Sequence, residues 1–163
     1  MFKKNPFFAT ILSKKSKNAI FGELKERDFI ELYFQKDYRY SDASIDSYIH
    51  RQIYQNISEA KYVCYAMPQS IIAYSLKSNN FKPEDCFGYL NFENIEIYDP
   101  KNFDDWYTRA PHEITQHLKN ENDIMIIKGY GIYRYSRDLN DLVKKIAILE
   151  NGAKMLLSSY NIN

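Results

Sequence analysis

The chain has 163 residues, of which 45% are hydrophobic, and a chain of this length buries roughly two-thirds of its unfolded surface as one domain. Its 22 basic and 21 acidic residues give a net charge of +1 and are spread along the whole length, which argues against nucleic acid or an anionic membrane as a partner. No stretch approaches the roughly 20 apolar residues that span a bilayer, and the N-terminal apolar run is too short for a secretory leader, so we expect a single cytoplasmic domain over residues 1–163.

The first third of the chain predicts two strands followed by a helix. Aromatic and β-branched residues at strand-like length favour strands over residues 7–12 and 28–34. Ser44 is a good N-cap for a helix over about residues 44–57. Isoleucines recur every four residues in this helix, at Ile45, Ile49, Ile53 and Ile57. This apolar stripe predicts that the helix packs against a sheet.

The middle of the chain continues to alternate strands with helices. Strands are expected over residues 62–66, 86–92 and 95–98. A helix with Pro68 in its first turn is expected to run to about residue 77, with an inward side formed by Ile71, Ile72 and Leu76. An acidic loop at Asp104-Asp105, with Trp106 tucked inward, then leads to a helix over about residues 111–120.

The last third predicts a buried hairpin followed by a long helix. Residues 124–127 are an apolar run suited to a strand buried on both faces, and a glycine-framed turn, Gly129-Tyr130-Gly131, separates it from a strand over residues 132–135. Asp138 caps a helix whose apolar positions are Leu142, Ile146, Leu149, Ala153 and Leu156. Helices interleaved with strands in this way predict a three-layer α/β/α sandwich.

Three segments carry residues in an order that is typical of one known family. They read ASIDSYIHRQIY over residues 43–54, YVCYAMP over residues 62–68, and IMIIKGYG over residues 124–131, with Asp138-Leu139 and Glu150 in the helix that follows. In these motifs the chain resembles the class II aldolase and adducin head-domain family, most strongly over residues 43–76 and 122–160. The resemblance implies a central sheet that is mostly antiparallel or mixed, flanked by helices.

The resemblance also implies that three zinc-binding histidines have been replaced. The family has histidine-threonine-histidine-proline at the end of a strand, and here Pro68 remains while the two histidine positions hold Tyr65 and Met67. The family's histidine-glycine turn keeps Gly131, with Tyr130 in place of the histidine. A phenol with a reference pKa of ~10 is mostly protonated at neutral pH, and a thioether is a soft ligand that suits Cu(I) better than zinc. We therefore expect no metal and no other cofactor at this site.

The acid/base and phosphate positions of the family have changed as well. Asp46 stands where the family has a glutamate and is shorter by one methylene, and Ser44 occupies one of the two serine positions before it. The family's two phosphate loops are not found in residues 1–24. The predicted site is therefore Asp46, as a degenerate catalytic position, together with four ligand-binding positions, Ser44, Tyr65, Met67 and Tyr130.

These departures favour a non-catalytic binding or scaffold protein that keeps the family's homo-oligomeric assembly, often a tetramer. The 15 tyrosines and 10 phenylalanines favour a bulky core and an aromatic subunit interface over a base-stacking surface. Two alternatives stay open. One is a zinc-independent lyase or epimerase acting on a small sugar phosphate, with Asp46 as base and Tyr65 or Tyr130 as proton donor or oxyanion stabiliser. The other is a sugar-phosphate sensor without chemistry.

The remaining candidates have structural interpretations. His50 is expected to be a packed, hydrogen-bonded core histidine, because no partner histidine remains near it. His112 and His117 are five residues apart on a predicted helix and do not share a face as a metal-binding pair would. Cys64 and Cys86 lack the spacing of a metal site and are predicted to be reduced, buried thiols.

Overall fold

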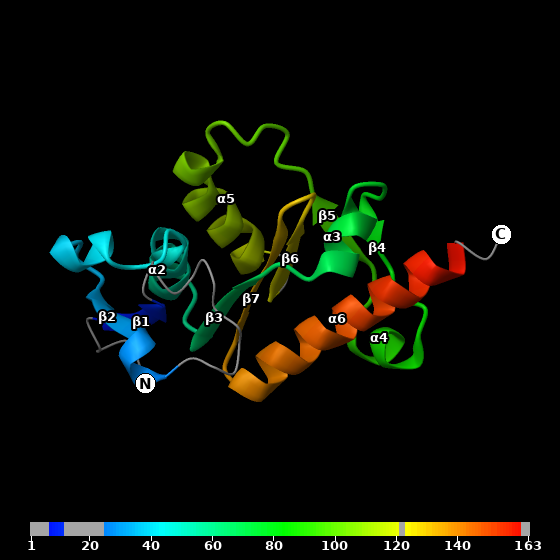
Figure 1. The fold of residues 1–163 in the computed structure, drawn as a ribbon, viewed down its shortest axis with the longest axis horizontal. Coiled ribbons are helices and arrows are strands. Elements are labelled where there is room, and N and C mark those ends of the chain that lie inside the picture. Colours follow the sequence, from blue (N-terminus) through cyan, green and yellow to red (C-terminus); the bar gives the residue numbers. More distant parts are fainter. Residues whose placement is uncertain (1–6, 12–24, 121–122, 161–163) are drawn as a thin grey trace.

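A five-stranded mixed sheet forms the centre of the molecule (Figure 1). The computed structural model describes residues 7–11, 25–120 and 123–160. Along the sheet the strands are ordered β3 (Tyr62–Ala66), β7 (Gly131–Ser136), β6 (Ile124–Ile127), β5 (Ile95–Tyr98) and β4 (Asn80–Phe81). The pairing of β5 with β6 is parallel, and the other three pairings are antiparallel.

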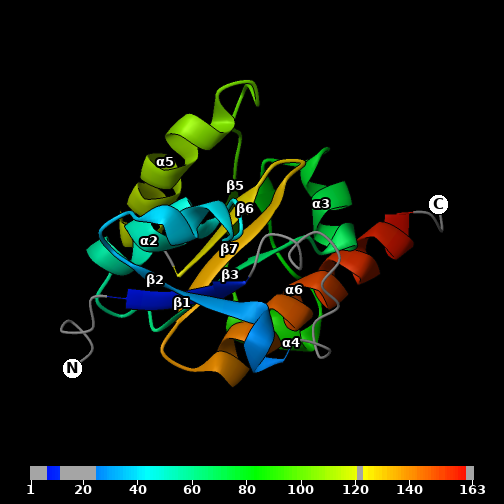
Figure 2. The ribbon, with the colours of Figure 1, turned by 60° about the vertical axis from the view of Figure 1, so that its left-hand side comes forward.

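Helices cover both faces of this sheet (Figure 2). One face is covered by α2 (Ser47–Asn56) and α5 (Trp106–Asn120), and the other by α3 (Gln69–Ser75), α4 (Cys86–Asn91) and α6 (Leu139–Tyr160). The arrangement confirms the predicted three-layer α/β/α sandwich with a mixed sheet. Among the described helices, none is both long and apolar enough to cross a lipid bilayer.

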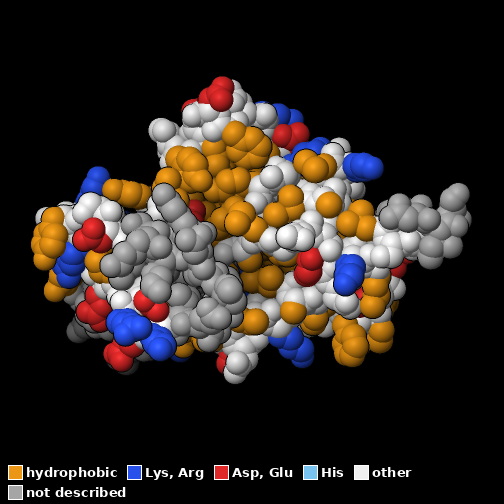
Figure 3. Space-filling model, in the orientation of Figure 1, with side chains coloured by type: hydrophobic (Ala, Val, Ile, Leu, Met, Phe, Trp, Pro, Cys, Tyr) orange, Lys and Arg blue, Asp and Glu red, His pale blue; other side chains and the backbone are white. Residues whose placement is uncertain are grey.

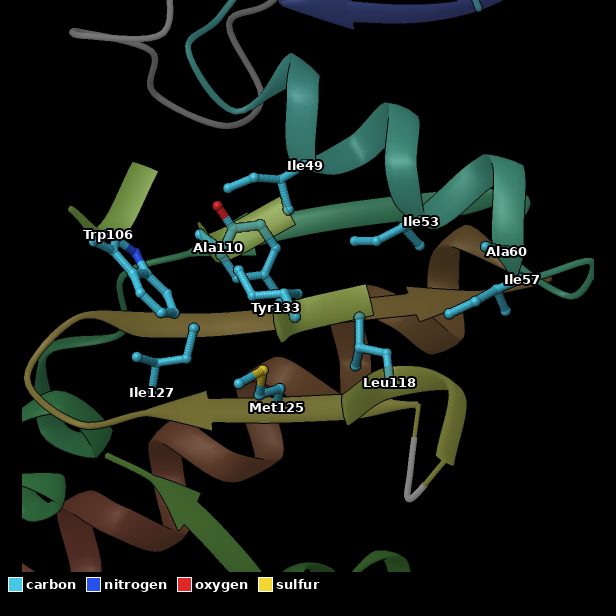
Figure 4. Close-up of a cluster of buried hydrophobic side chains, with 11 residues drawn as sticks. Ile49, Ile53, Ile57, Ala60, Trp106, Ala110, Leu118, Met125, Ile127 and Tyr133 are labelled. Carbon is cyan, nitrogen blue, oxygen red and sulfur yellow. The ribbon is translucent and has the colours of Figure 1, made fainter. Parts of the chain in front are cut away.

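Strand β6 shows why both faces need a helical layer. All four of its side chains are buried, and they alternate between the two hydrophobic clusters of the core. Met125 and Ile127 point toward α2 and α5, where they meet the isoleucines of α2 and the inner side of α5 (Figure 4). Ile124 and Ile126 point the other way, toward Leu149 and its neighbours on α6. The continuous apolar run at 124–127 is thus the sequence pattern of a strand with no solvent face.

The N-terminal strands form a small sheet of their own. Strands β1 (Phe7–Ile11) and β2 (Phe29–Tyr33) pair antiparallel, close to the predicted bounds, but no ladder among the described residues joins them to the five-stranded sheet. The short 3-10 helices η1 (Glu26–Asp28) and η2 (Tyr38–Ser41) flank β2. A third cluster of buried side chains, Leu32, Tyr40 and Ala43, packs between β2, η2 and the approach to α2.

The prediction of a strand at 86–92 is wrong, because this segment is helix α4. Asp85 begins the helix, and its carboxylate accepts a hydrogen bond from the backbone N–H of Gly88 at 2.9 Å. Phe87 and Tyr89 lie on the outside of this helix, whereas Phe92, directly after it, packs against the core cluster that contains Ile71. Strand β4, which pairs with β5, was not anticipated.

Three helix boundaries also differ from the predictions. Helix α5 begins at Trp106, and Pro111 lies inside it. Helix α2 begins after Asp46, so Ser44 is not its N-cap, and Ile45, predicted to lie on its inward side, precedes the helix and is 58% exposed. Helix α3 ends at Ser75, which leaves Leu76 at 62% exposure and not inward as predicted. By contrast Trp106 is buried as expected, and Asp138 caps α6 by accepting from the N–H of Asp141 at 2.8 Å.

Candidate functional site

The end of β3 and the turn between β6 and β7 bring two of the predicted site residues into contact. The rings of Tyr65 and Tyr130 lie 5.0 Å apart between centroids, and the hydroxyl of Tyr65 donates a hydrogen bond to the backbone oxygen of Tyr130 at 3.0 Å. Met67 follows β3 directly, and its side chain is 67% exposed. Two aromatic rings and a carbonyl oxygen therefore occupy the space between these two segments.

Gly131 allows the turn to approach β3 this closely. Its φ is +153°, in a region that residues with a side chain rarely adopt. A Cβ atom placed there would lie 2.5 Å from the backbone oxygen of Ala66 and 2.9 Å from a ring carbon of Tyr65. The glycine that the sequence retains next to Tyr130 is thus required by the geometry of the site.

Tyr133 connects this cluster to Asp46 and was missed by the sequence analysis. Its hydroxyl donates to a carboxylate oxygen of Asp46 at 2.8 Å, and its ring stacks on that of Tyr65 with centroids 4.9 Å apart. Tyr133 is fully buried. The signal was present in the sequence, because antiparallel pairing of 62–66 with 132–135 can place Tyr65 directly opposite Tyr133, as it does here.

Burial keeps the phenols of this cluster protonated. It raises the pKa of Tyr65 and of Tyr133 far above the ordinary value, and the negative charge of Asp46 raises both further. Burial also raises the pKa of Tyr130, and its hydrogen bond with the hydroxyl of Tyr107 raises it further. These hydroxyls therefore act as hydrogen-bond donors over the whole neutral and moderately alkaline range.

An aromatic surface continues the cluster toward solvent. The hydroxyls of Tyr130 and Tyr107 lie 3.5 Å apart, and the ring of Tyr130 stacks on Phe103 with centroids 5.9 Å apart. Buried Trp106 meets the same ring edge-on at 5.7 Å. Phe103 and Tyr107 are about half exposed, and Figure 3 shows hydrophobic side chains gathered over the middle of this face.

The other predicted residues lie around this cluster without adding to its chemistry. Ser44 is buried just before α2, where its carbonyl accepts from the N–H of Ser47 at 2.9 Å. His50 packs edge-on against Tyr133 at 6.3 Å, as a core histidine should, but its Nε2 makes no hydrogen bond within the described residues, contrary to the prediction. Burial lowers the pKa of His50.

The two cysteines differ from each other. Cys86 is exposed at the start of α4, so the prediction that it is buried is wrong. Cys64 is half-buried on β3, and burial, together with the charge of Asp46, raises the pKa of its thiol to about 11. The first thiol is therefore open to reagents and the second is not reactive at neutral pH.

The donor atoms at the three family metal positions can be compared with those that zinc prefers. Zinc takes thiolates, imidazole nitrogens and carboxylate oxygens. The atoms present are two protonated phenols and a thioether, and the Tyr65 hydroxyl is already directed at a carbonyl. Within residues 25–120 and 123–160, no three His, Cys, Asp or Glu side chains gather closely enough to hold a metal ion. The donor set therefore does not fit zinc. The stretch 1–24, where the family's phosphate loops were sought, lies outside the described residues except for β1.

Glu150 caps the N-terminus of helix α3 beside the site. Its carboxylate reaches across from α6 and accepts from the backbone N–H groups of Ser70, at 3.0 Å to each oxygen, and of Ile71 at 3.1 Å. These are the donors that the side chain of an N-cap residue normally satisfies. Pro68 occupies the N-cap position of α3 and has no side-chain acceptor. Glu150 thus holds the corner between β3 and α3 that carries Met67.

Comparison with known proteins finds similarity to class II aldolases in sequence and in fold. A sequence model described as the class II aldolase and adducin N-terminal domain matches residues 10–157. An L-fuculose-1-phosphate aldolase from Thermus thermophilus superposes with a TM-score of 0.70 at 20% identity, over 84% of this chain and 72% of that chain. An L-fuculose 1-phosphate aldolase structure gives a TM-score of 0.66 at 12% identity, over 99% and 79% of the two chains. An aldolase II superfamily protein from Pseudomonas syringae gives 0.70 at 12% identity, over 95% and 61%. No curated protein matches the chain by sequence.

Proposed function

The chain belongs to the class II aldolase and adducin N-terminal domain family, and from this premise we propose that it is a cytoplasmic, homo-oligomeric binding or scaffold domain that does not perform a zinc-dependent aldol reaction. The observation that carries the proposal is the contact between Tyr65 and Tyr130. Two metal positions of the family are filled by rings that pack on each other, and the hydroxyl of Tyr65 donates a hydrogen bond to the backbone oxygen of Tyr130. A ligand-binding role does not require the chemistry that these replacements remove.

The chemistry of the donor atoms supports a protein without a zinc site. Each phenol would have to lose a proton to become a good zinc ligand, and burial makes that loss harder for both Tyr65 and Tyr130. Met67 offers a soft thioether, which zinc binds weakly. We therefore propose that the protein works without zinc.

Restoring the histidines tests the assignment of these positions. The combined change Tyr65→His, Met67→His and Tyr130→His is expected to create a zinc site, and calorimetric titration should show one zinc bound per chain. The unchanged protein, after treatment with a chelator, should show none. Zinc binding by the unchanged protein at one per chain, weakened by Met67→Ala, would overturn the proposal.

A ligand can be sought by thermal shift without assuming any reaction. A panel of triose, tetrose and pentose phosphates, each with and without zinc, would be compared with the same sugars lacking phosphate. A ligand at 100 times its dissociation constant adds about 2.7 kcal/mol of stability, or roughly 5–10 °C for a chain of this size. Stabilisation that depends on zinc would contradict the proposal. Zinc-independent stabilisation by a sugar phosphate would support a sensor or a zinc-independent enzyme, and an activity screen would separate the two.

A second candidate is a zinc-independent lyase or epimerase acting on a small sugar phosphate. The hydrogen bond between Tyr133 and Asp46 favours it, because it holds a carboxylate in a fixed position beside protonated phenols. In this case Asp46 is the base and Tyr65 or Tyr130 donates a proton. Turnover of a sugar phosphate that survives chelation and is lost in Asp46→Asn would establish the enzyme. Turnover that Asp46→Asn leaves unchanged would exclude it.

A further inference from the structure

Residues 101–105, which we call the strap, form an exposed loop between two buried anchors. Pro100 and Trp106 are buried at its ends, whereas every residue between them is exposed. In Figure 1 the strap belongs to the arch at the top, between β5 and α5. A segment without a buried side chain of its own has few apolar contacts to lose, and such segments open locally at low cost in free energy.

The strap covers the aromatic cluster of the candidate site through Phe103. The ring of Phe103 stacks on that of Tyr130 at 5.9 Å and meets that of Trp106 edge-on at 6.3 Å, both between centroids. Tyr65 packs against the same ring of Tyr130 at 5.0 Å. Withdrawal of Phe103 would therefore uncover part of Tyr130 and of the indole of Trp106.

Arg109 fastens the strap from its position on α5. Its Nη2 donates to the backbone oxygen of Pro100 at 2.6 Å and also to that of Asn102. Its Nε donates to the carboxylate of Asp105 at 2.9 Å. The Nη1 donates to the carboxylate of Glu113 at 2.7 Å, one turn further along the helix. One side chain, itself held by Glu113, thus ties down both ends of the strap.

The closed strap carries two local costs. The N–H of Asn102 donates to the oxygen of Pro100 at 2.7 Å, which closes a three-residue turn around Lys101 with φ at +62°. A γ-turn with positive φ is rare, and it is strained when the central residue has a side chain. The second cost lies at Trp106, which is 1% exposed and whose Nε1 makes no hydrogen bond within the described residues. A buried indole N–H ordinarily has a partner, so both features favour opening and Arg109 opposes it.

We propose that the strap opens and closes over the Tyr65–Tyr130 cluster, with Arg109 as its latch and the strained turn at Lys101 as the element that favours opening. The open arrangement presents the ring of Tyr130 and the indole of Trp106 to a ligand. A small molecule with an apolar face for stacking and an oxygen that accepts from the indole N–H suits this surface. The inference rests on the proposed binding function for its purpose, because the strap controls access to the same site.

Acrylamide quenching of fluorescence tests the latch, because Trp106 is the one tryptophan of the chain. Arg109→Met keeps an unbranched side chain but removes the hydrogen bonds to the strap. The quenching constant should rise about threefold, with emission at longer wavelength, as the indole meets solvent in the opened loop. Arg39→Met is the matched control. Arg39 also has a 25% exposed side chain, an aspartate partner and a tyrosine ring beneath it, but these contacts lie in and beside η2 and β2.

A pair of substitutions at Lys101 tests the strain without altering a contact of the indole. Valine disfavours positive φ strongly and glycine adopts it freely, while both remove the same ion pair with Asp99, which has an N–O distance of 3.6 Å. Lys101→Val should therefore open the strap and raise the quenching constant as Arg109→Met does. Lys101→Gly should leave the constant at or below that of the unchanged protein. The Lys101 side chain is 84% exposed, so circular dichroism should show an unaltered fold in both variants.

The outcomes decide the proposal. A rise in Arg109→Met and Lys101→Val that is absent from Lys101→Gly and Arg39→Met would establish the strap. A rise in Arg109→Met alone would overturn it, because Arg109 lies over the indole at 5.2 Å and its removal bares the ring directly. An equal rise in both Lys101 variants would overturn it as well, since the lost ion pair would be the cause.

The same measurements keep the strap separate from the proposed function. None of them uses a ligand or zinc. Unchanged quenching in Arg109→Met and Lys101→Val would overturn the strap and leave the binding role standing. Opening of the strap in a protein that binds no member of the sugar-phosphate panel would support the strap and count against a sugar phosphate as its ligand.

Discussion

Removal of the Glu150 carboxylate is expected to destabilise the fold by about 2 kcal/mol. Glu150 accepts from the N–H groups of Ser70 and Ile71 in the first turn of α3, and Pro68 offers no side-chain replacement. Loss of an N-cap costs ~0.5–2 kcal/mol, and a hydrogen bond to a charged group contributes ~1.5–3 kcal/mol. Because part of the lost bonding is recovered from water at this half-buried position, the expected cost of Glu150→Ala lies near the middle of these ranges. Glu150→Gln keeps one acceptor oxygen and should cost about half as much.

Urea denaturation followed by far-ultraviolet circular dichroism would measure the change. The midpoint should fall with an unchanged slope, and the melting temperature should drop by roughly 4–8 °C for a chain of this size. Asn151→Ala is the control, since Asn151 is exposed on the next position of α6. Pro68→Asp in the Glu150→Ala protein should restore most of the stability, because an aspartate at the N-cap can accept from the same N–H groups. A loss below ~0.5 kcal/mol, or no recovery with Pro68→Asp, would refute the reasoning.

Three further predictions follow from buried groups. Burial lowers the pKa of His50 below 6.5, so the unfolded chain binds more protons there, and stability present above pH 6.5 is lost as the pH falls below it. His50→Phe should reduce the difference in urea midpoint between neutral pH and about pH 5.5, and an unaltered difference would contradict this. Gly152→Ala brings a methyl group to 2.8 Å from Asp85 and should cost ~1–3 kcal/mol by denaturation, whereas an unchanged midpoint would mean that the helices separate freely. Tyr133→Phe removes the bond to Asp46 and should cost ~1–2 kcal/mol, and a neutral effect in the same assay would show that water replaces the hydroxyl.

The sequence predicted the strand and the helix whose apolar residues follow a clear periodicity. A run of four apolar residues at 124–127 between polar neighbours fits a strand covered on both faces. The four-residue spacing of Ile49, Ile53 and Ile57 fits the buried side of α2, whereas Ile45, the first of the predicted stripe, is exposed. The layers of the sandwich follow from these elements. Family motifs then located the two segments that meet at Tyr65 and Tyr130, and the structure confirms that these residues touch.

The errors concern features that only tertiary contacts determine. The segment 86–92 has aromatic residues at strand-like density, and it becomes a helix because Asp85 caps it and Gly88 fits against Pro83. The role of Tyr133 depends on strand register, which one residue of slippage would reverse. Glu150 was noted as a family residue, but its partners lie 80 residues earlier in the chain, and no local pattern reports a contact at that distance.

Helix α6 supplies part of the core late in the chain, and this affects folding during synthesis. It contacts α3, α4, β3 and β7, and its buried residues Leu149, Ala153 and Leu156 complete one half of the core. A nascent chain that ends after β7 therefore contains every described strand of the sheet, together with α3 and α4, but leaves open to solvent the part of this face that α6 covers, where it can associate with other unfinished chains. Synthesis of residues 139–160 completes the cover of this face, so truncation before Leu139 should yield an aggregating product even though the positions around Asp46, Tyr65 and Tyr130 are all present.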